Sequence, residues 1–349
     1  MFSVSQKEKI FFTTHLHLMI KSGMPLSEAL EVLRDEALSK NFRNILNNIL
    51  ERVSEGESLS KSLERHPKVF NKFFTSVVKT GEESGTLEEN LEYLNSSLES
   101  ENSLKKKMLS ALIYPLFIIF VTLFIVLALT IFVLPKLFNL FQALDIQLPL
   151  STKILLGSGD FLQKHWLQFF ISAVVLFLIY KILNRIKIIR FYFNKISLSL
   201  PIFGKINKNR NLAVFARTLY TLLKSGMPLL ESLDICIGVL PNEVYKRDLV
   251  IIRSIAERGE KVSQGLKKSS NNFPQIFYQM VAVGERTGAL EESMRHLAQF
   301  YETEVDSSLK NLLIILEPVL LIFVGSIVAF VALSIITPIY QFTSGLKFR

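Results

Sequence analysis

The stretch GEESGTLEE at Gly81–Glu89 returns as GERTGALEE at Gly284–Glu292, and this pair decides how the chain is organised. At the same offset, residues 10–138 align without a gap to residues 213–341. Solenoid repeats are only about 20 to 50 residues long. The much longer repeat of this chain therefore indicates one duplicated module.

Each copy has the pattern of a bundle of short helices. Apolar residues recur at helical spacing, and no alternating strand pattern competes with it. Both copies contain KSGMPL, in which the glycine suits a left-handed helix end and the proline suits the first turn of the next helix. These residues are Gly23, Pro25, Gly226 and Pro228. We expect about six helices per copy, with Gly81 ending the fifth and Ser84 capping the sixth.

Three apolar segments have the composition of membrane-spanning helices. Ala111–Pro135 has no charged side chain, and Leu312–Pro338 has one, Glu317. Trp166–Leu183 is shorter and contains Lys181 near its end. A helix of about 20 apolar residues crosses a bilayer. The predicted fold class is therefore an all-α membrane protein, with two duplicated cytoplasmic helical bundles and three transmembrane helices.

The charges predict the orientation of these spans. The net charge is +9, and the basic residues Lys105–Lys107 precede the first span. The stretch after the second span is basic without an acid: Lys181, Arg185, Lys187, Arg190, Lys195, Lys205, Lys208 and Arg210. Basic flanks mark the cytoplasmic side. We expect a multi-pass protein of the cytoplasmic (inner) membrane with its N-terminus in the cytoplasm and its C-terminus outside.

The sequence also predicts the domain boundaries. Cytoplasmic helical domain 1 covers residues 1–110, transmembrane helix 1 residues 111–135, an external loop residues 136–165, and transmembrane helix 2 residues 166–183. A basic connector and cytoplasmic helical domain 2 cover residues 184–311, transmembrane helix 3 residues 312–338, and an external tail residues 339–349. The basic excess is assigned to the membrane surface, and no nucleic-acid partner is expected. The single cysteine, Cys236, excludes a disulfide within the chain.

These motifs together resemble the inner-membrane platform proteins of type II secretion and type IV pilus machines. The resemblance rests on the duplicated GE-x-[ST]-G-x-L-E and KSGMPL segments, on KMLSALIYP at Lys107–Pro115, and on ILEPVL at Ile315–Leu320. It covers nearly the whole chain. It implies a platform that contacts a hexameric assembly ATPase, pilin or pseudopilin subunits, other inner-membrane machine components and membrane lipid, and that forms a homo-oligomer. Such a platform couples the ATPase to insertion of pilin-like subunits into a filament. The motifs leave open whether the machine builds a pilus, secretes proteins or takes up DNA.

The repeated acidic motif provides the candidate docking residues. They are Gly81, Glu82, Gly85, Gly284, Glu285 and Gly288, joined by Glu317 in the third span. Three roles are open for Glu82 and Glu285: a structural role, through backbone hydrogen bonds or a basic side chain, the docking of a partner, or a divalent cation. One carboxylate per module is few ligands for a cation. Glu317 either reaches the membrane interface or contacts another subunit or a pilin-like helix.

Prolines lie at both ends of the first and third spans. They are Pro115, Pro135, Pro318 and Pro338. Proline removes a helical hydrogen bond and bends a helix, so we expect fixed kinks and helix ends, with a hinge as the alternative.

No catalytic pattern is present in the sequence. It lacks G-x-S-x-G, H-E-x-x-H and the phosphate-binding G-x-x-x-x-G-K-[ST]. We therefore expect no enzyme activity and no cofactor. The alternatives to a platform are a membrane transporter, which needs polar residues along its spans, or an unrelated membrane scaffold.

Overall fold

The computed structural model describes residues 4–133, 136, 150–183, 186–201 and 203–345. Within these ranges the backbone forms helices and short connections, without a strand. Internal contacts divide the chain into two units. One unit comprises Met1–Lys107 and Arg190–Ser308, and the other comprises Met108–Ile189 and Leu309–Arg349. Both sequence repeats contribute a helical bundle to the first unit.

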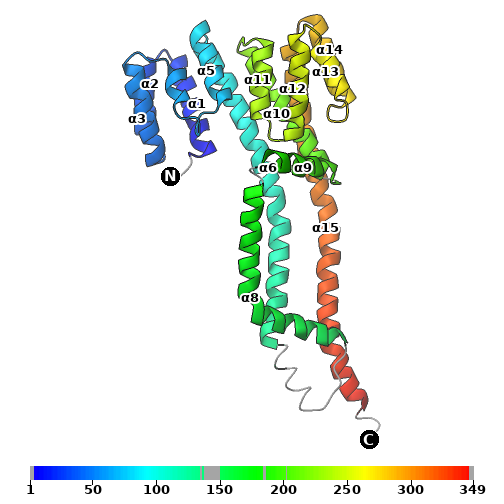
Figure 1. The fold of residues 1–349 in the computed structure, drawn as a ribbon. Coiled ribbons are helices and arrows are strands. Elements are labelled where there is room, and N and C mark those ends of the chain that lie inside the picture. Colours follow the sequence, from blue (N-terminus) through cyan, green and yellow to red (C-terminus); the bar gives the residue numbers. More distant parts are fainter. Residues whose placement is uncertain (1–3, 134–135, 137–149, 184–185, 202, 346–349) are drawn as a thin grey trace. The chain divides into compact units, whose positions relative to one another are not determined.

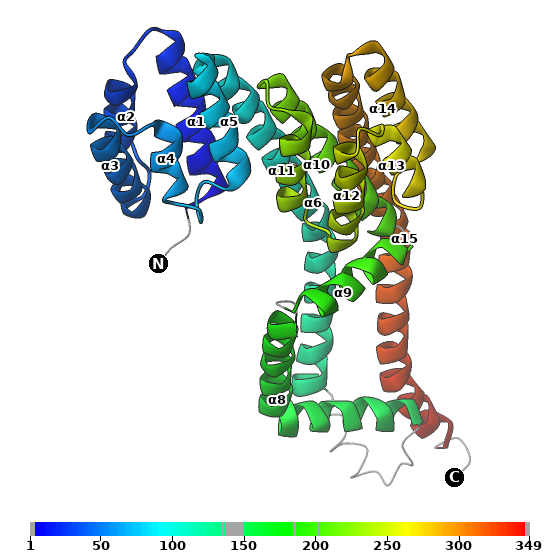
Figure 2. The same cartoon turned by 45° about the horizontal axis from the view of Figure 1, so that its top comes forward.

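The two bundles have the same order of helices, which confirms the predicted all-helical, duplicated fold. The first module contains α1 (Gln6–Lys21), α2 (Leu26–Asp35), α3 (Lys40–Ser54), α4 (Leu59–Glu64), α5 (Lys72–Ser84) and the start of α6 (Leu87–Ala128). The second module contains α10 (Phe203–Lys224), α11 (Leu229–Val239), α12 (Glu243–Glu257), α13 (Val262–Lys268), α14 (Gln275–Thr287) and the start of α15 (Leu290–Gly345). An additional helix, α9 (Lys187–Ser199), precedes the second module (Figures 1 and 2).

Three phenylalanine rings form the centre of each module. In the first module, the ring centroids of Phe12, Phe70 and Phe74 lie 4.8 to 6.3 Å apart. The equivalent rings of the second module lie 5.6 to 6.0 Å apart and belong to Phe215, Phe273 and Phe277. All six side chains are fully buried. Aromatic burial on this scale dominates the energetics of a small core, so each bundle has a hydrophobic centre of its own.

The KSGMPL segments form the turns between the first two helices of each module. Gly23 and Gly226 have φ angles of 82° and 89°, the left-handed conformation that the sequence predicted. Pro25 and Pro228 lie at the N-cap positions of α2 and α11, one residue earlier than the predicted first turn. Neither proline has a side chain that can accept a hydrogen bond, so α2 and α11 begin without a side-chain cap from the N-cap residue.

The apolar unit is built from three long segments. The structure has two helical stretches that are long and apolar enough to cross a membrane, Leu87–Val133 and Leu290–Thr337. The first includes a short π-helix, η1 (Leu129–Val133). The third segment, α8 (Leu150–Leu183), is bent, and its later part runs beside α6 (Figure 1). Among the described residues its apolar stretch is the shorter Val174–Leu183, so the count of three spans stays a prediction.

Two segment ends differ from the sequence prediction. Residues 150–165, which the sequence assigned to an external loop, form the beginning of α8, whose Thr152 hydroxyl donates to the Ser334 carbonyl at 2.6 Å. Helix α15 continues beyond Pro338 to Gly345, so this proline does not end the helix. Pro135 and the loop residues 137–149 lie outside the described residues.

Candidate functional site: the repeated helix junction

The first glycine of each repeated motif lies inside a helix, where two helices come into close contact. A Cβ atom on Gly81 of α5 would lie 3.0 Å from the Cα atom of Leu87 in α6. On Gly284 of α14 it would lie 2.9 Å from the Cα atom of Leu290 in α15. The contact at Gly284 is too short for a Cβ atom, and the one at Gly81 is at the lower limit of such contacts. The prediction that Gly81 ends its helix is therefore wrong, because this glycine is required for close packing rather than for a break.

The second glycine of each motif ends the helix. Gly85 and Gly288 both have φ angles of 72°, and each donates its N–H to the carbonyl of the motif's first glycine. The left-handed cap therefore comes four residues later than predicted. As a result, Ser84 is the last residue of α5, and its hydroxyl donates to the Thr80 carbonyl at 2.7 Å. The prediction that Ser84 caps α6 is wrong for this reason.

Glu82 reaches from α5 to the N-terminus of α4. Its Oε1 accepts a hydrogen bond from the Leu59 N–H at 2.6 Å, and its Oε2 accepts one from the Ser60 N–H at 2.9 Å. The first N–H groups of a helix have no partner within the helix, and they form its positive end. No N-cap side chain serves this helix. Glu82 therefore caps α4 from a neighbouring helix and fixes α4 against α5.

Glu285 makes the same connection in the second module. It accepts hydrogen bonds from the Val262 N–H at 2.6 Å and from the Ser263 N–H at 3.2 Å, at the start of α13. The Ser263 hydroxyl donates a third bond at 2.5 Å. Helix α13 also lacks a capping bond from its own N-cap residue. The repeated glutamate thus joins the fourth and fifth helices of each module by hydrogen bonds.

The geometry around the two glutamates corresponds to the structural role among the three that the sequence left open. Their carboxylate oxygens are directed to backbone N–H groups rather than to other acids. Among the described residues, no three His, Cys, Asp or Glu side chains gather as cation ligands. Both side chains remain partly accessible, so a partner can still contact the junction.

A set of polar contacts that sequence reasoning missed joins the two modules. Glu302 of α15 accepts two hydrogen bonds from the Arg217 guanidinium, at 2.8 and 2.7 Å, and a third from the Ser100 hydroxyl of α6 at 2.9 Å. Lys107 of α6 pairs with Asp306 of α15. A bidentate arginine contact is the strong form of ion pair. The bonds to Ser100 and Lys107 connect the two helices that lead into the apolar segments.

A cavity of about 200 Å³ lies between the modules, and it is lined by more basic than acidic side chains. Lys9, Lys105, Arg210 and Glu101 are among its lining residues. Burial lowers the pKa of Lys9, with nearby Glu101 acting against the shift and Lys105 adding to it. The cavity and the cross-module bonds lie close together, because Arg217 and Glu302 also line it.

Three of the remaining candidate residues lie on α6 and α15. Glu317 is exposed, and it makes no ion pair with any of the described residues. Pro115 lies inside α6, and Pro318 lies inside α15, so neither ends a helix. Glu317 thus belongs to the second unit, whereas the repeated motifs belong to the first.

Comparison with known proteins gives the same duplicated organisation. The sequence model of the family "Type II secretion system (T2SS), protein F" matches twice, at residues 12–135 and 215–338. The chain is 32% identical to the type IV pilus assembly protein PilC of Pseudomonas aeruginosa, over 95% of this chain and 88% of that protein. It is 32% identical to PilC of Thermus thermophilus, over 96% of this chain and 82% of that protein. It is 30% identical to the type II secretion system protein F of Vibrio cholerae, over 97% and 83% respectively. The chain therefore belongs to the type II secretion system protein F family, whose members include pilus assembly proteins and are components of inner-membrane machines.

Proposed function

We propose that this chain is the inner-membrane platform of a type IV pilus or type II secretion machine, and that it couples a cytoplasmic assembly ATPase to the insertion of pilin-like subunits into a filament. The observation that carries the proposal is the double family match, which in each copy runs from the helical bundle into the apolar segment. Relatives with pilus-assembly and secretion names align with nearly the whole chain. We propose further that the platform acts without catalysis of its own.

The modules have the construction expected of parts that transmit force. Within each one, the glutamate cap and the close glycine contact fix the fourth, fifth and sixth helices to one another. Helices α6 and α15 then continue without a chain break from the module into the apolar segment, over 42 and 56 residues. A displacement of either module is therefore carried along a continuous helix rather than lost in a flexible linker.

The proposed topology has α8 as a returning span. Two copies that both begin in the cytoplasm and both end in an outward helix need one helix that crosses back. The test is labelling with a membrane-impermeant maleimide on intact spheroplasts. The only natural cysteine, Cys236, is fully buried and stays unlabelled. Lys153→Cys is expected to react from outside and Lys195→Cys only after lysis. If both react from the same side, α8 does not span.

The function is tested by deletion and by capture of partners. Deleting the gene from the source organism should abolish filaments or secretion while the levels of the ATPase and the pilin-like proteins stay normal. The tagged protein, taken from mild-detergent membranes, should co-purify with both. A deletion strain with normal filaments and normal secretion would exclude the platform role, and the type of pilin recovered would separate pilus assembly from secretion.

A further inference from the structure

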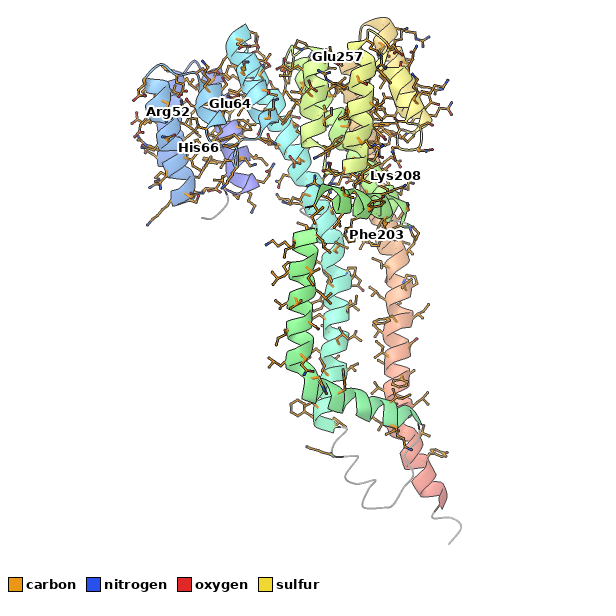
Figure 3. The ribbon with its side chains drawn as sticks, viewed as in Figure 1. Arg52, Glu64, His66, Phe203, Lys208 and Glu257 are labelled. Atoms are coloured by element: carbon orange, nitrogen blue, oxygen red, sulfur yellow. The ribbon has the colours of Figure 1, made fainter. Side chains whose placement is uncertain are left out.

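Helix α9 exposes a continuous apolar stripe. Ile188 is 70% exposed, Tyr192 61% and Ile196 58%, at intervals of one helical turn. At about 100° per residue, these three side chains lie within about 80° of arc on one face. Leu200 and Phe203 follow in the sequence and are also exposed. Figure 3 labels Phe203. Such a stripe on a short helix has the pattern of an interfacial amphipathic helix.

The opposite face of α9 is attached to the second module. Arg190 forms an ion pair with Glu243 at the start of α12, and the Arg247 guanidinium lies 5.7 Å from the centroid of the Phe191 ring. Leu198 is buried. These contacts fix the rotation of the helix about its axis. The apolar stripe therefore faces away from the module, and its exposure follows from the fold.

The charges around α9 point to an anionic surface. From residue 161 to residue 230 the chain contains no Asp or Glu, although it contains many Lys and Arg residues. Lys195 lies at the edge of the stripe, is exposed, and makes no ion pair with a described residue. An anionic membrane surface attracts such a segment, and an acidic residue would weaken the attraction.

We propose that α9 lies in the headgroup region of the cytoplasmic leaflet, with Ile188, Tyr192 and Ile196 in the upper acyl layer and Lys195 against anionic phospholipid headgroups. The inference rests on the proposed topology, in which α8 returns to the cytoplasmic side directly before α9. Tyrosine at the stripe suits this depth, because its ring is apolar and its hydroxyl stays hydrated. The helix thereby attaches the second module to the membrane surface.

The test uses fluorescence quenching on the full chain in lipid vesicles. Tyr192→Cys and Ile196→Cys are each labelled with a fluorophore, and the vesicles contain lipid with a nitroxide near the headgroup end of the acyl chain. The matched control is Leu38→Cys in the first module, because Leu38 is apolar and 70% exposed, as Ile188 is. Phe120→Cys in α6, at a side chain that is 67% exposed, reports insertion of the spans.

Quenching at positions 192 and 196, with none at position 38, is the expected result. If position 120 is quenched but 192 and 196 are not, the α9 proposal fails and the proposed topology survives. If position 120 is also unquenched, the proposed membrane topology fails as well. If other machine proteins shield the labels at positions 192 and 196 from the nitroxide lipid, the stripe binds a protein partner. That result would overturn the lipid assignment.

The role of charge is tested at Lys195. In vesicles of mixed phosphatidylcholine and phosphatidylglycerol, a nitroxide on phosphatidylglycerol should quench the position-192 label more than one on phosphatidylcholine. One basic residue near a membrane surface contributes about a fivefold preference. Lys195→Gln should lower the ratio of the two quenching signals by about this factor. An unchanged ratio would exclude headgroup binding by Lys195.

Discussion

The two modules share the same internal structural features but differ in their polar surfaces. Both contain the three-phenylalanine centre, the capping glutamate and the left-handed glycine. In the first module Asn48 and Arg52 of α3 form a polar cluster with His66, which follows α4, and His66 Nε2 lies 3.1 Å from Asn48 Oδ1. Figure 3 labels Arg52 and His66. Burial lowers the pKa of His66, and nearby Arg52 lowers it further.

The second module is apolar at two of the three equivalent positions, and Ser269 stands where the first module has His66. Ile251 and Ile255 stand where the first module has Asn48 and Arg52, and Ile251 is exposed. The internal framework of the duplicated module is thus maintained, while its outer face has diverged. The repeated motifs therefore determine the fold of each copy. Any difference in binding between the two modules depends on their surface residues.

The largest expected effect is at the aromatic centre, and it tests whether the modules are independent. Phe12→Ala and the equivalent Phe215→Ala should each lower the free energy of unfolding of their own module by about 3–5 kcal/mol, because a large cavity is left. Hydrogen exchange followed by mass spectrometry on the full chain reads each module separately. Faster exchange confined to the substituted module would show independence, and faster exchange in both would show that they unfold as one body.

The capping glutamates should reveal a difference between the copies. Glu82→Gln and Glu285→Gln both replace charge-assisted bonds to backbone N–H groups, which contribute about 1.5–3 kcal/mol. The larger loss is expected at Glu285, since Ser263 adds a hydroxyl bond there. Ser263→Ala is the matched control. In its background, the stability lost on Glu285→Gln should be close to the stability that the first module loses on Glu82→Gln. Equal losses from both glutamate variants in the same exchange measurement would exclude a contribution from this third bond.

Most of the module fold could be predicted from the helical spacing of apolar residues and from the glycines and prolines at helix ends. Six helices per copy and the left-handed Gly23 and Gly226 were correct, because glycine and proline act locally. The helix end was assigned to Gly81, whereas the structure places it at Gly85. Either glycine can end a helix locally, and only the contact of α5 with α6 shows that Gly81 is needed inside it.

The contacts between distant segments could not be predicted. Glu82 was recognised as a junction residue, but its target at Leu59 depends on how α4 packs against α5. The bonds from Arg217 and Ser100 to Glu302 join three helices from two modules, and no local pattern marks them. From the sequence, only the basic charge of the segment that forms α9 was recognised. Its apolar stripe could not be predicted, because the stripe is defined only once the other face of the helix packs against α12.

A smaller and equal effect is expected at the left-handed caps. Gly85→Ala and Gly288→Ala force an L-residue into a φ angle of 72°, which costs about 1–2 kcal/mol, although the space around both positions is open. Because the two φ angles are identical, the two modules should lose the same stability in thermal unfolding of the full chain. Gly85→Asn is the control, since asparagine tolerates this conformation and should lose less. Unequal losses would mean that the caps are not equivalent in solution.

The smallest effect is a pH dependence at one position of the first module. Burial acts to raise the pKa of Glu8, but the hydrogen bonds from the Ser39 hydroxyl and from Ser5 outweigh it, so the pKa lies below its ordinary value of 4.5. The stabilisation is therefore complete above that ordinary pKa, and it is lost as the pH falls through the lower pKa of the folded state. The second module has Asn211 at the equivalent position, which does not titrate. In exchange measurements corrected for intrinsic rates, the difference between the wild type and Glu8→Gln should be confined to the first module and should shrink below about pH 4. A difference that stays constant with pH would mean that the Glu8 contribution is one of shape rather than of charge.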